Sequence, residues 1–326
     1  MQKLLTITIP TYNRAGMLDE QLAWLATEIK GHESECEIII YDNCSTDNTF
    51  EVITKWQLAL STAITFNYNR NNKNIGGMLN LVACMQAATG KYIWTLGDDD
   101  PIQKGTLIYI LKKLKENSNL TLIVLNGNGR DKLTNEIIVD RWFDSSSDKP
   151  SINSKLEFEY FLNRNMGGVL FISAAIYHTK LLQEALQSWQ DAAKNLASQA
   201  YWMAYCAAGG SFIVTSNLHT ECTMGIGYTD KDPQWTFKMQ FICIPEVYLK
   251  LMKTGYSKKF CFLMILQNFQ RINSWKILFG GFRRWFLFAS KGFIFYLSCV
   301  IVATRMILLG SDNEQLQVET IKQSSG

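Results

Sequence analysis

Short apolar runs alternate with segments of helical hydrophobic spacing through the first 125 residues, and this alternation restricts the fold more than any other feature. The strand-like runs lie at 4–9, 37–41, 63–68, 92–96 and 120–125. Apolar residues recur every three or four positions at 18–29, 77–88 and 107–114. Strands that alternate with helices favour an α/β fold with a mostly parallel sheet covered on both faces.

Beyond residue 125 the pattern is less regular. Polar loops are expected around 126–154, interrupted by a strand at 136–143, and a helix is expected at 198–208. Further strands are expected at 169–177 and 211–215. A length of 326 residues favours one large domain, or one domain with an extension.

Three polar stretches each follow directly after an expected strand. They are "PTYNR" at 10–14, "DNCSTD" at 42–47 and "GDDD" at 97–100. Ligands of open α/β sheets bind at the carboxyl ends of the strands, so these stretches are expected to meet at one edge.

The three consecutive aspartates Asp98, Asp99 and Asp100 have two interpretations. They precede a helix, and aspartate is favoured near a helix N-terminus. One aspartate would be enough for capping, whereas three at the end of a buried strand need a counter-charge. We therefore favour a hard divalent cation, Mg²⁺ or Mn²⁺, completed by substrate phosphates and water.

Two weaker signals lie on the same expected edge. Asp42 could cap a helix that begins near Ser45, or it could accept hydrogen bonds from a ribose or a base. In "NNKNIGGMLN" at 71–80, Gly76 and Gly77 permit close backbone approach before a helix whose N-terminus could face a phosphate.

The segment 247–311 contains no Asp or Glu but ten Lys and Arg, so the net charge of +3 leaves −7 for the rest of the chain. Basic clusters also bind nucleic acids, but interleaved aromatic and aliphatic residues favour an anionic membrane surface. Only thirteen uncharged residues separate Lys291 from Arg305, fewer than the ~20 that a membrane-spanning helix needs. We therefore expect helices that lie in the membrane interface, or that pack on the rest of the protein.

The eight cysteines include no CxxC pair and no metal-site spacing, which favours a reducing compartment. The apolar run at the start is ended by Pro10 and polar residues before a signal-peptide core could form. A cytoplasmic protein is therefore expected.

The succession "TITIPTYNR", "EIIIYDNCSTDNT", "NKNIGGMLN" and "GKYIWTLGDDD" resembles the N-terminal half of family 2 glycosyltransferases of the GT-A fold. The variants "YDNCSTD" and "LGDDD" resemble the abequosyltransferase-like branch, which builds bacterial surface polysaccharides such as O-antigen or capsule. The resemblance covers residues 4 to about 115. It implies a Rossmann-like, mostly parallel sheet flanked by helices. The composition adds the expectation of a basic, aromatic-rich helical C-terminal extension.

The resemblance also implies roles for single residues. The residues that match the loop lining the nucleotide are Pro10, Thr11, Tyr12 and Arg14. Asp42 matches the aspartate that contacts the base, and Gly76 and Asn80 match the segment beside the sugar nucleotide. The aspartates 98–100 match the DxD motif, whose last member holds the metal. Two alignments are possible, because Asp98-x-Asp100 fits the motif directly, whereas counting from Leu96 ends it at Asp99.

The implied reaction is an inverting transfer of a sugar from a nucleotide-diphosphate donor to a hydroxyl group, which also needs a general base. Many relatives carry an acidic pair before a Trp-containing helix, but the corresponding stretch here has Ala197, Ser198 and Gln199. Asp191 is the nearest upstream carboxylate and is one candidate base. His219 matches a histidine that approaches the metal or the diphosphate in many GT-A enzymes, and the neighbouring Glu221 is a second candidate base.

We thus expect a GT-A catalytic domain at 1–245, with a nucleotide-binding half at 1–115 and an acceptor half at 116–245. A membrane-associating extension at 246–310 and a flexible tail at 311–326 would follow. A lipid-linked oligosaccharide acceptor at the cytoplasmic membrane face would explain the basic surface. The Q-x-x-R-W signature of processive synthases is absent, so non-processive hexosyl or deoxyhexosyl transfer is expected. The alternatives are a nucleotidyltransferase and a non-catalytic nucleotide-sugar-binding scaffold protein.

Overall fold

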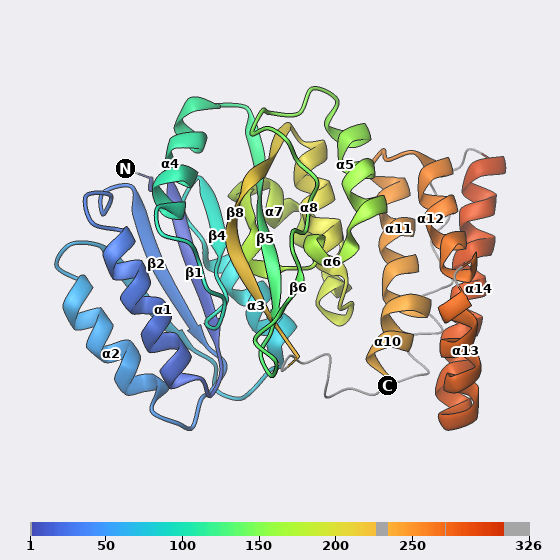
Figure 1. Ribbon diagram of the computed structural model, residues 1–326, viewed down its shortest axis with the longest axis horizontal. Helices are drawn as coiled ribbons and strands as arrows, with labels where there is room; N and C mark the ends of the chain where they lie inside the picture. The colour runs from blue at the N-terminus through green and yellow to red at the C-terminus, as the bar shows by residue number, and fades with distance from the viewer. Residues whose placement is uncertain (1, 226–233, 271, 310–326) are drawn as a thin grey trace.

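A computed structural model describes residues 2–225, 234–270 and 272–309 (Figure 1). Its first half alternates strands and helices as expected. These elements are β1 (Leu5–Thr11), α1 (Ala15–Glu28), β2 (Cys36–Asp42), α2 (Thr49–Leu60), β3 (Thr65–Arg70), α3 (Gly77–Ala87), β4 (Tyr92–Thr95) and α4 (Thr106–Glu116).

The second half continues the sheet and adds helices. Its elements up to the last strand are β5 (Leu120–Asp131), β6 (Ile137–Val139), α5 (Ser154–Arg164), α6 (Met166–Val169), η1 (Ile172–Ala174), β7 (Ala175–His178), α7 (Thr179–Ser188), η2 (Gln190–Lys194), α8 (Ser198–Ala208) and β8 (Ser211–Met224). The helical C-terminal region comprises α10 (Trp235–Lys238), η3 (Met239–Cys243), α11 (Ile244–Lys253), α12 (Lys258–Gln270), α13 (Ile272–Arg284) and α14 (Phe286–Leu308).

The strands form one sheet in the order β3-β2-β1-β4-β7-β5-β6, with β8 also paired to β5. The four strands β3, β2, β1 and β4 run parallel, whereas β7 is antiparallel to both of its neighbours. The chain moves outward from β1 to β3 and returns to β4 on the other side of β1. The strand order therefore reverses beside β1, which is where open α/β sheets bind ligands.

Helices cover both faces of the sheet, which confirms the predicted α/β class. Alternate residues of β1, including Ile7 and Ile9, pack in one core with Leu22 of α1 and Leu111 of α4. A second core on the opposite face joins α3, α7 and α8 and extends into the C-terminal helices. Figure 1 shows these last helices as a layer at one end of the molecule.

The second half contains three errors of the sequence-based expectations. The run 169–177 is mostly not a strand, because α6 and η1 occupy it and β7 begins only at Ala175. Buried helical turns and buried strands both give continuous apolar runs, so periodicity could not separate them. The strand expected at 136–143 is limited to β6, and Trp142 and Phe143 beyond it are buried. Finally, β5 and β8 pair as far as Asp131 and Met224, well past the expected strand ends.

The C-terminal helices share the second core with the sheet domain, because Phe237, Leu278, Tyr296 and Trp202 belong to one apolar cluster. A boundary between 245 and 246 stays a prediction, and the tail at 311–326 lies outside the described residues. In the described part of the chain, one helix, α14, is long and apolar enough to cross a membrane by length and composition, with 23 residues and a mean hydropathy of 2.0 over an 18-residue window. The length argument from Lys291 to Arg305 was therefore wrong, because the helix begins before Lys291 and continues past Arg305.

Candidate active site

The polar stretches that follow β1, β2 and β4 lie at the same edge of the sheet, as expected. Thr11 at the end of β1 is in register with Asp42 at the end of β2, and Thr8 is in register with Thr95 of β4. Because β1, β2 and β4 run parallel, the loops that follow them leave the sheet at the same edge. The candidate site is therefore assembled by the topology of β1, β2 and β4.

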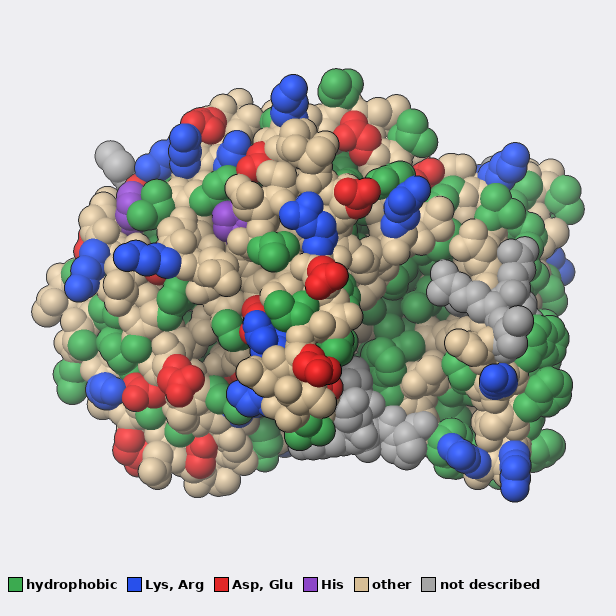
Figure 2. Space-filling view, in the orientation of Figure 1, with side chains coloured by type: hydrophobic (Ala, Val, Ile, Leu, Met, Phe, Trp, Pro, Cys, Tyr) green, Lys and Arg blue, Asp and Glu red, His purple; other side chains and the backbone are tan. Residues whose placement is uncertain are grey.

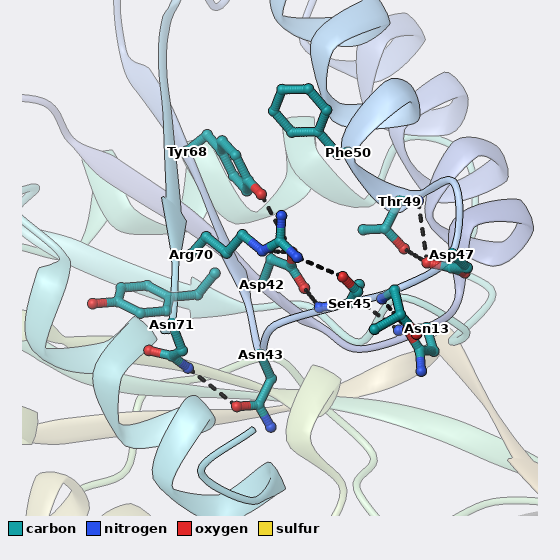
Figure 3. Close-up of polar contacts among 12 residues, drawn as sticks. Asn13, Asp42, Asn43, Ser45, Asp47, Thr49, Phe50, Tyr68, Arg70 and Asn71 are labelled. Carbon is teal, nitrogen blue, oxygen red and sulfur yellow. Dashed lines mark hydrogen bonds and ion pairs between the residues drawn. The ribbon is translucent and has the colours of Figure 1, made fainter. Parts of the chain in front are cut away.

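Asp42 is fully buried at this edge and is surrounded by hydrogen-bond donors (Figure 3). It accepts hydrogen bonds from the Ser45 backbone N–H at 2.8 Å and from the Tyr68 hydroxyl at 3.2 Å. The Arg70 guanidinium lies 3.5 Å away and also donates to the Ser45 carbonyl at 2.7 Å. Burial and the Asp42 charge raise the pKa of Tyr68 to about 12, so its hydroxyl keeps its proton. Phe50 pairs with Tyr68, with ring centroids 6.0 Å apart, and leaves half of its surface exposed.

The loops after β1 and β2 are joined by side-chain to backbone hydrogen bonds. Asn13 donates its backbone N–H to the Ser45 hydroxyl at 2.9 Å, and its side-chain oxygen accepts from the Thr46 N–H at 2.7 Å. Asn13 and Cys44 have φ angles of +53° and +66°, a left-handed conformation that is uncommon outside glycine. Such backbone persists only where surrounding contacts over-determine it, and here the two loops hold each other.

Asn43, Asn71 and Asn80 form an amide network behind this loop pair. The Asn43 side-chain oxygen accepts from Asn71 at 3.1 Å and from the Ile75 N–H at 2.9 Å. Asn71 also donates to Asn80, which in turn donates to the Tyr41 carbonyl at 3.0 Å. Asn80 is buried, so its amide ties α3 to the end of β2. Gly76 has a φ of +91°, which an L side chain rarely adopts, and it leads directly into α3.

The aspartates 98–100 have different partners. Asp98 is buried and accepts from the Thr11 hydroxyl at 2.7 Å and from Arg14 at 2.9 Å. Asp99 accepts from the same Arg14 nitrogen at 2.7 Å. Asp100 accepts from the Ser173 hydroxyl at 2.6 Å. The structure thus brings Thr11, Arg14, Asp98 and Asp99 into direct contact.

Burial and mutual repulsion shift the ionisation of these carboxyl groups. Burial, followed by the neighbouring Asp99 charge, raises the pKa of Asp100 to about 7. Burial also raises the pKa of Asp98, although Arg14 and Thr11 oppose this effect. Partial burial alone would lower the pKa of Arg14, but Asp98 and Asp99 outweigh it and raise that pKa. The protein groups around the aspartates thus do not fully offset the cost of ionising Asp98 and Asp100.

The residues of this cluster fit a divalent cation that arrives with a diphosphate. Within residues 2–225, 234–270 and 272–309, no group of three or more His, Cys, Asp or Glu could hold a metal by itself. Mg²⁺, however, is bound by one or two carboxylates, with substrate phosphates and water in the other positions. Asp99 and Asp100 offer carboxylate oxygens of this hard kind, and a cation beside them would favour the charged form of Asp100.

His219 and Glu221 lie on β8 and are both held by other residues. The His219 ring lies 4.5 Å from the Tyr109 ring, and its Nδ1 is 3.2 Å from the Thr106 hydroxyl. Glu221 forms an ion pair with Arg130 at 2.8 Å, which lowers the Glu221 pKa. A carboxylate with a lowered pKa is a weaker base. The Glu221 N–H donates to the Pro101 carbonyl at 2.9 Å and the Thr223 hydroxyl to the Asp99 carbonyl at 3.4 Å, so β8 passes beside the aspartate loop.

Asp191 lies in η2, where it is half exposed and pairs with Lys194 at 2.8 Å. Pro10 and Tyr12 lie at the end of β1 and just after it, and Tyr12 is 40% exposed, so its ring is available to a ligand. The assignments of Asp191, Glu221 and His219 stay predictions.

The sequence interpretation missed four residues that contact the site. Arg70 is the last residue of β3, and Asn43 directly follows β2. Because polar residues at strand ends were expected to line the site, both residues could have been identified from the sequence. Tyr68 lies two residues before the end of β3, so it too stands near the carboxyl edge of the sheet. Ser173 had no local signal, because it lies in η1 within a run that was expected to be a strand.

A sequence model of glycosyl transferase family 2 matches residues 6–172, a little over half of the chain. Among curated proteins, abequosyltransferase RfbV of Salmonella typhimurium is 31% identical over 176 residues, which cover 53% of this chain and 52% of the relative. The poly(ribitol-phosphate) beta-N-acetylglucosaminyltransferase TarS of Staphylococcus aureus is 29% identical over 127 residues, 38% of this chain and 22% of the relative. The chain thus spans about half of the first relative's length, and less of the second's.

Solved structures share the fold at lower sequence identity. TarS 1–349 in complex with UDP-GlcNAc has a TM-score of 0.64 and 16% identity, covering 92% of this chain and 81% of that chain. The mannosyltransferase PcManGT from Pyrobaculum calidifontis, in complex with GDP-Man and Mn²⁺, has a TM-score of 0.57 and 14% identity, covering 99% and 85%. These matches confirm the GT-A fold that the sequence motifs implied.

Proposed function

The chain belongs to glycosyl transferase family 2, and we propose that it moves a sugar from a nucleotide-diphosphate donor to a hydroxyl group of a glycan acceptor. The observation that carries the proposal is the arrangement of side chains at the carboxyl edge of β2, β1 and β4, where the strand order reverses. Buried Asp42 with its aromatic neighbours stands on one side of this edge, and the aspartates 98–100 stand on the other. A nucleoside fits the first part, and a diphosphate with a cation fits the second.

The donor assignment has support from the similar structures. TarS 1–349 was solved with UDP-GlcNAc and PcManGT with GDP-Man and Mn²⁺. In this chain, Tyr12 and Phe50 offer exposed aromatic surface near Asp42, and Arg70 offers hydrogen-bond donors. These groups would hold the base and ribose, whereas Gly76 allows the donor to approach the N-terminus of α3.

We propose a Mn²⁺ or Mg²⁺ cofactor held by Asp99 and Asp100 against the donor diphosphate. When bound, such a cation stabilises the negative charge that develops on the leaving nucleoside diphosphate. The role of the chain's own residues is to position that charge. Thr11 and Arg14 fix Asp98, and Ser173 fixes Asp100.

The transfer is proposed to invert the anomeric centre, with a general base that removes the proton of the acceptor hydroxyl. Asp191 and Glu221 are the candidates from the sequence. The Arg130 ion pair weakens Glu221 as a base, and Asp191 lies in η2 beyond α7. The replaced acidic pair before Trp202 is also the observation that favours the alternative, a non-catalytic nucleotide-sugar-binding scaffold.

We further propose a lipid-linked oligosaccharide acceptor at the cytoplasmic face of the membrane. The support is an apolar stripe on α14, where Leu287, Ile294, Ile301 and Leu308 recur every seven residues and are each more than half exposed. Residues two helical turns apart lie on one side of a helix, so the stripe is continuous. Exposed apolar stripes of this length mark interaction surfaces.

Positive charge accompanies the stripe. The exposed basic residues described in α13 and α14 are Lys276, Arg283, Arg284, Lys291 and Arg305. Figure 2 shows green apolar and blue basic side chains together over the C-terminal helices. Each Lys or Arg near an anionic surface contributes about 1 kcal/mol to binding. A role in bacterial O-antigen or capsule synthesis accords with the similarity to RfbV.

A thermal-shift panel of UDP, dTDP, CDP and GDP sugars, with and without Mn²⁺, tests the donor site. Stabilisation by one nucleotide that depends on the metal supports the proposal. Product analysis then separates the alternatives, because a glycosyltransferase releases a nucleoside diphosphate and a nucleotidyltransferase releases pyrophosphate. Donor binding without hydrolysis or transfer to any glycan would instead support the scaffold.

A further inference from the structure

One nitrogen of Arg14 bridges two neighbouring carboxylates. Its Nη1 lies 2.9 Å from Asp98 Oδ1 and 2.7 Å from Asp99 Oδ2. The guanidinium comes from the residue that precedes α1, whereas the aspartates follow β4. Arg14 is permanently charged, because its guanidinium is not deprotonated in proteins. It therefore supplies positive charge to two adjacent carboxylates, Asp98 and Asp99.

The two carboxylates that Arg14 bridges are not equivalent. Asp98 has both oxygens engaged, one by Arg14 and one by Thr11, and its side chain is 5% exposed. The Asp99 side chain is 24% exposed, and Arg14 is its side-chain partner among the described residues. Asp98 is thus part of the fold's internal hydrogen bonding, whereas Asp99 is reached from solvent and held by one exchangeable contact.

We propose that Arg14 competes with the divalent cation for Asp99. This inference rests on the metal site of the proposed function and adds a residue that regulates it. Half-exposed ion pairs are weak, so a divalent cation accompanied by a diphosphate can displace the guanidinium from Asp99. Arg14 keeps its contact with Asp98, because that carboxylate is buried and fixed by Thr11. The site therefore binds the cation poorly by itself and well together with the donor.

Substitution of Arg14 tests the competition directly. Arg14→Gln removes the charge but keeps a hydrogen-bond donor for Asp98. We expect this variant to bind Mn²⁺ alone roughly tenfold more tightly than the unsubstituted protein, measured from the free Mn²⁺ signal in electron paramagnetic resonance. Lys55→Gln is the matched control, because it removes a positive charge that pairs with Asp19 between α2 and α1. Its Mn²⁺ affinity should remain that of the unsubstituted protein.

Arg14→Lys separates charge from packing and should keep Mn²⁺ affinity close to the starting value. A measurement on the unsubstituted protein removes any dependence on variant folding. The Arg14 Nε–H resonance, in protein with ¹⁵N-labelled arginine, should shift on addition of Mg²⁺ and inorganic pyrophosphate. An unchanged Arg14 resonance at saturation, or an Arg14→Gln variant that binds Mn²⁺ no more tightly, overturns the inference. Neither measurement uses sugar transfer. The competition can therefore be confirmed in a protein that shows no transfer, and it can be overturned in a protein that does transfer a sugar.

Discussion

The Ser173 hydroxyl donates a hydrogen bond to the Asp100 carboxylate at 2.6 Å, across 73 residues of sequence. The same hydroxyl accepts from the Gly97 N–H at 2.8 Å, and the Ser173 carbonyl accepts from the Trp94 indole at 2.8 Å. Ser173 therefore holds both ends of the loop that carries the aspartates. The orientation of Asp100 depends on η1, which lies in the other half of the chain.

Gly97 is expected to tolerate no side chain, because a Cβ there would collide with the Asp100 carboxylate and approach the Ser173 hydroxyl. Gly97→Ala should displace Asp100 and lower the metal-dependent thermal shift with the preferred nucleotide. Gly16→Ala on α1 is the matched control, since a Cβ there meets no atom within 4 Å. Equal metal-dependent shifts in the two variants would contradict the proposed positioning of Asp100.

Asp99→Ala and Asp100→Ala should each lower sugar transfer by about 100-fold or more, because they remove ligands of the charge-stabilising cation. Initial rates across a Mn²⁺ titration measure the effect. The thermal shift with nucleotide should also lose its dependence on Mn²⁺. Retention of that dependence by both variants would remove these residues from the metal site.

His219 should make the protein less stable in mild acid. Burial lowers the pKa of His219, so the unfolded chain binds a proton more readily than the folded protein. As the pH falls below about 6.5, His219 gains its proton in the unfolded state first, which lowers the free energy of unfolding. The raised pKa of Asp100 acts in the opposite direction, so the His219 contribution is read from the difference between the variant and the unsubstituted protein. His219→Asn should reduce this loss, measured as the melting temperature between about pH 7 and pH 5. An Asn variant with the original pH dependence would disprove the assignment to His219.

Leu287→Glu should weaken binding to anionic vesicles by roughly tenfold, because it replaces an apolar contact worth about 1.5 kcal/mol with a charge that anionic lipids repel. Co-sedimentation with vesicles that contain phosphatidylglycerol measures the binding. Leu58→Glu on α2 is the matched control, since Leu58 and Leu287 are 75% and 76% exposed. If Leu287→Glu instead changed the oligomeric state and left vesicle binding intact, the stripe would be an interface between copies of the chain.

The adjacent glycines of α13 should respond in opposite directions to alanine. A Cβ on Gly281 would lie 2.8 Å from the buried Phe237 ring, so Gly281→Ala should destabilise the protein by about 1–3 kcal/mol. A Cβ on Gly280 meets nothing within 4 Å, so Gly280→Ala should stabilise the helix by up to about 1 kcal/mol. Chemical unfolding measures both. Similar free energies of unfolding for the two variants would show that α13 does not pack on Phe237 in solution.

Much of the site could be predicted from local sequence. A polar stretch follows each parallel strand of the first half, and these stretches mark the carboxyl edge of the sheet. This rule found Thr11, Asp42 and Asp98, and the structure places all three at one edge. Asn43 and Arg70 obey the same rule and could have been found with it.

The errors and omissions concern contacts between distant segments. An apolar run around Val169 is equally consistent with a buried strand and with buried helical turns. β5 and β8 also pair beyond Asn126, where their side chains are mostly polar. The pairing is made by backbone groups, so the side-chain pattern did not predict that these strands continue.

The sequence by itself determined the α/β class, the convergence of polar loops at the reversal of strand order, and the excess of carboxylates there. These follow from hydrophobic periodicity and from the direction of parallel strands, which are local properties. Only the tertiary structure decided which carboxylate oxygen meets which partner. Thr11 and Arg14 engage the Asp98 carboxylate, Arg14 engages the Asp99 carboxylate, and Ser173 engages the Asp100 carboxylate. Hydrogen bonds between groups 70 or more residues apart depend on packing of the whole domain, so the three adjacent aspartates received three different environments.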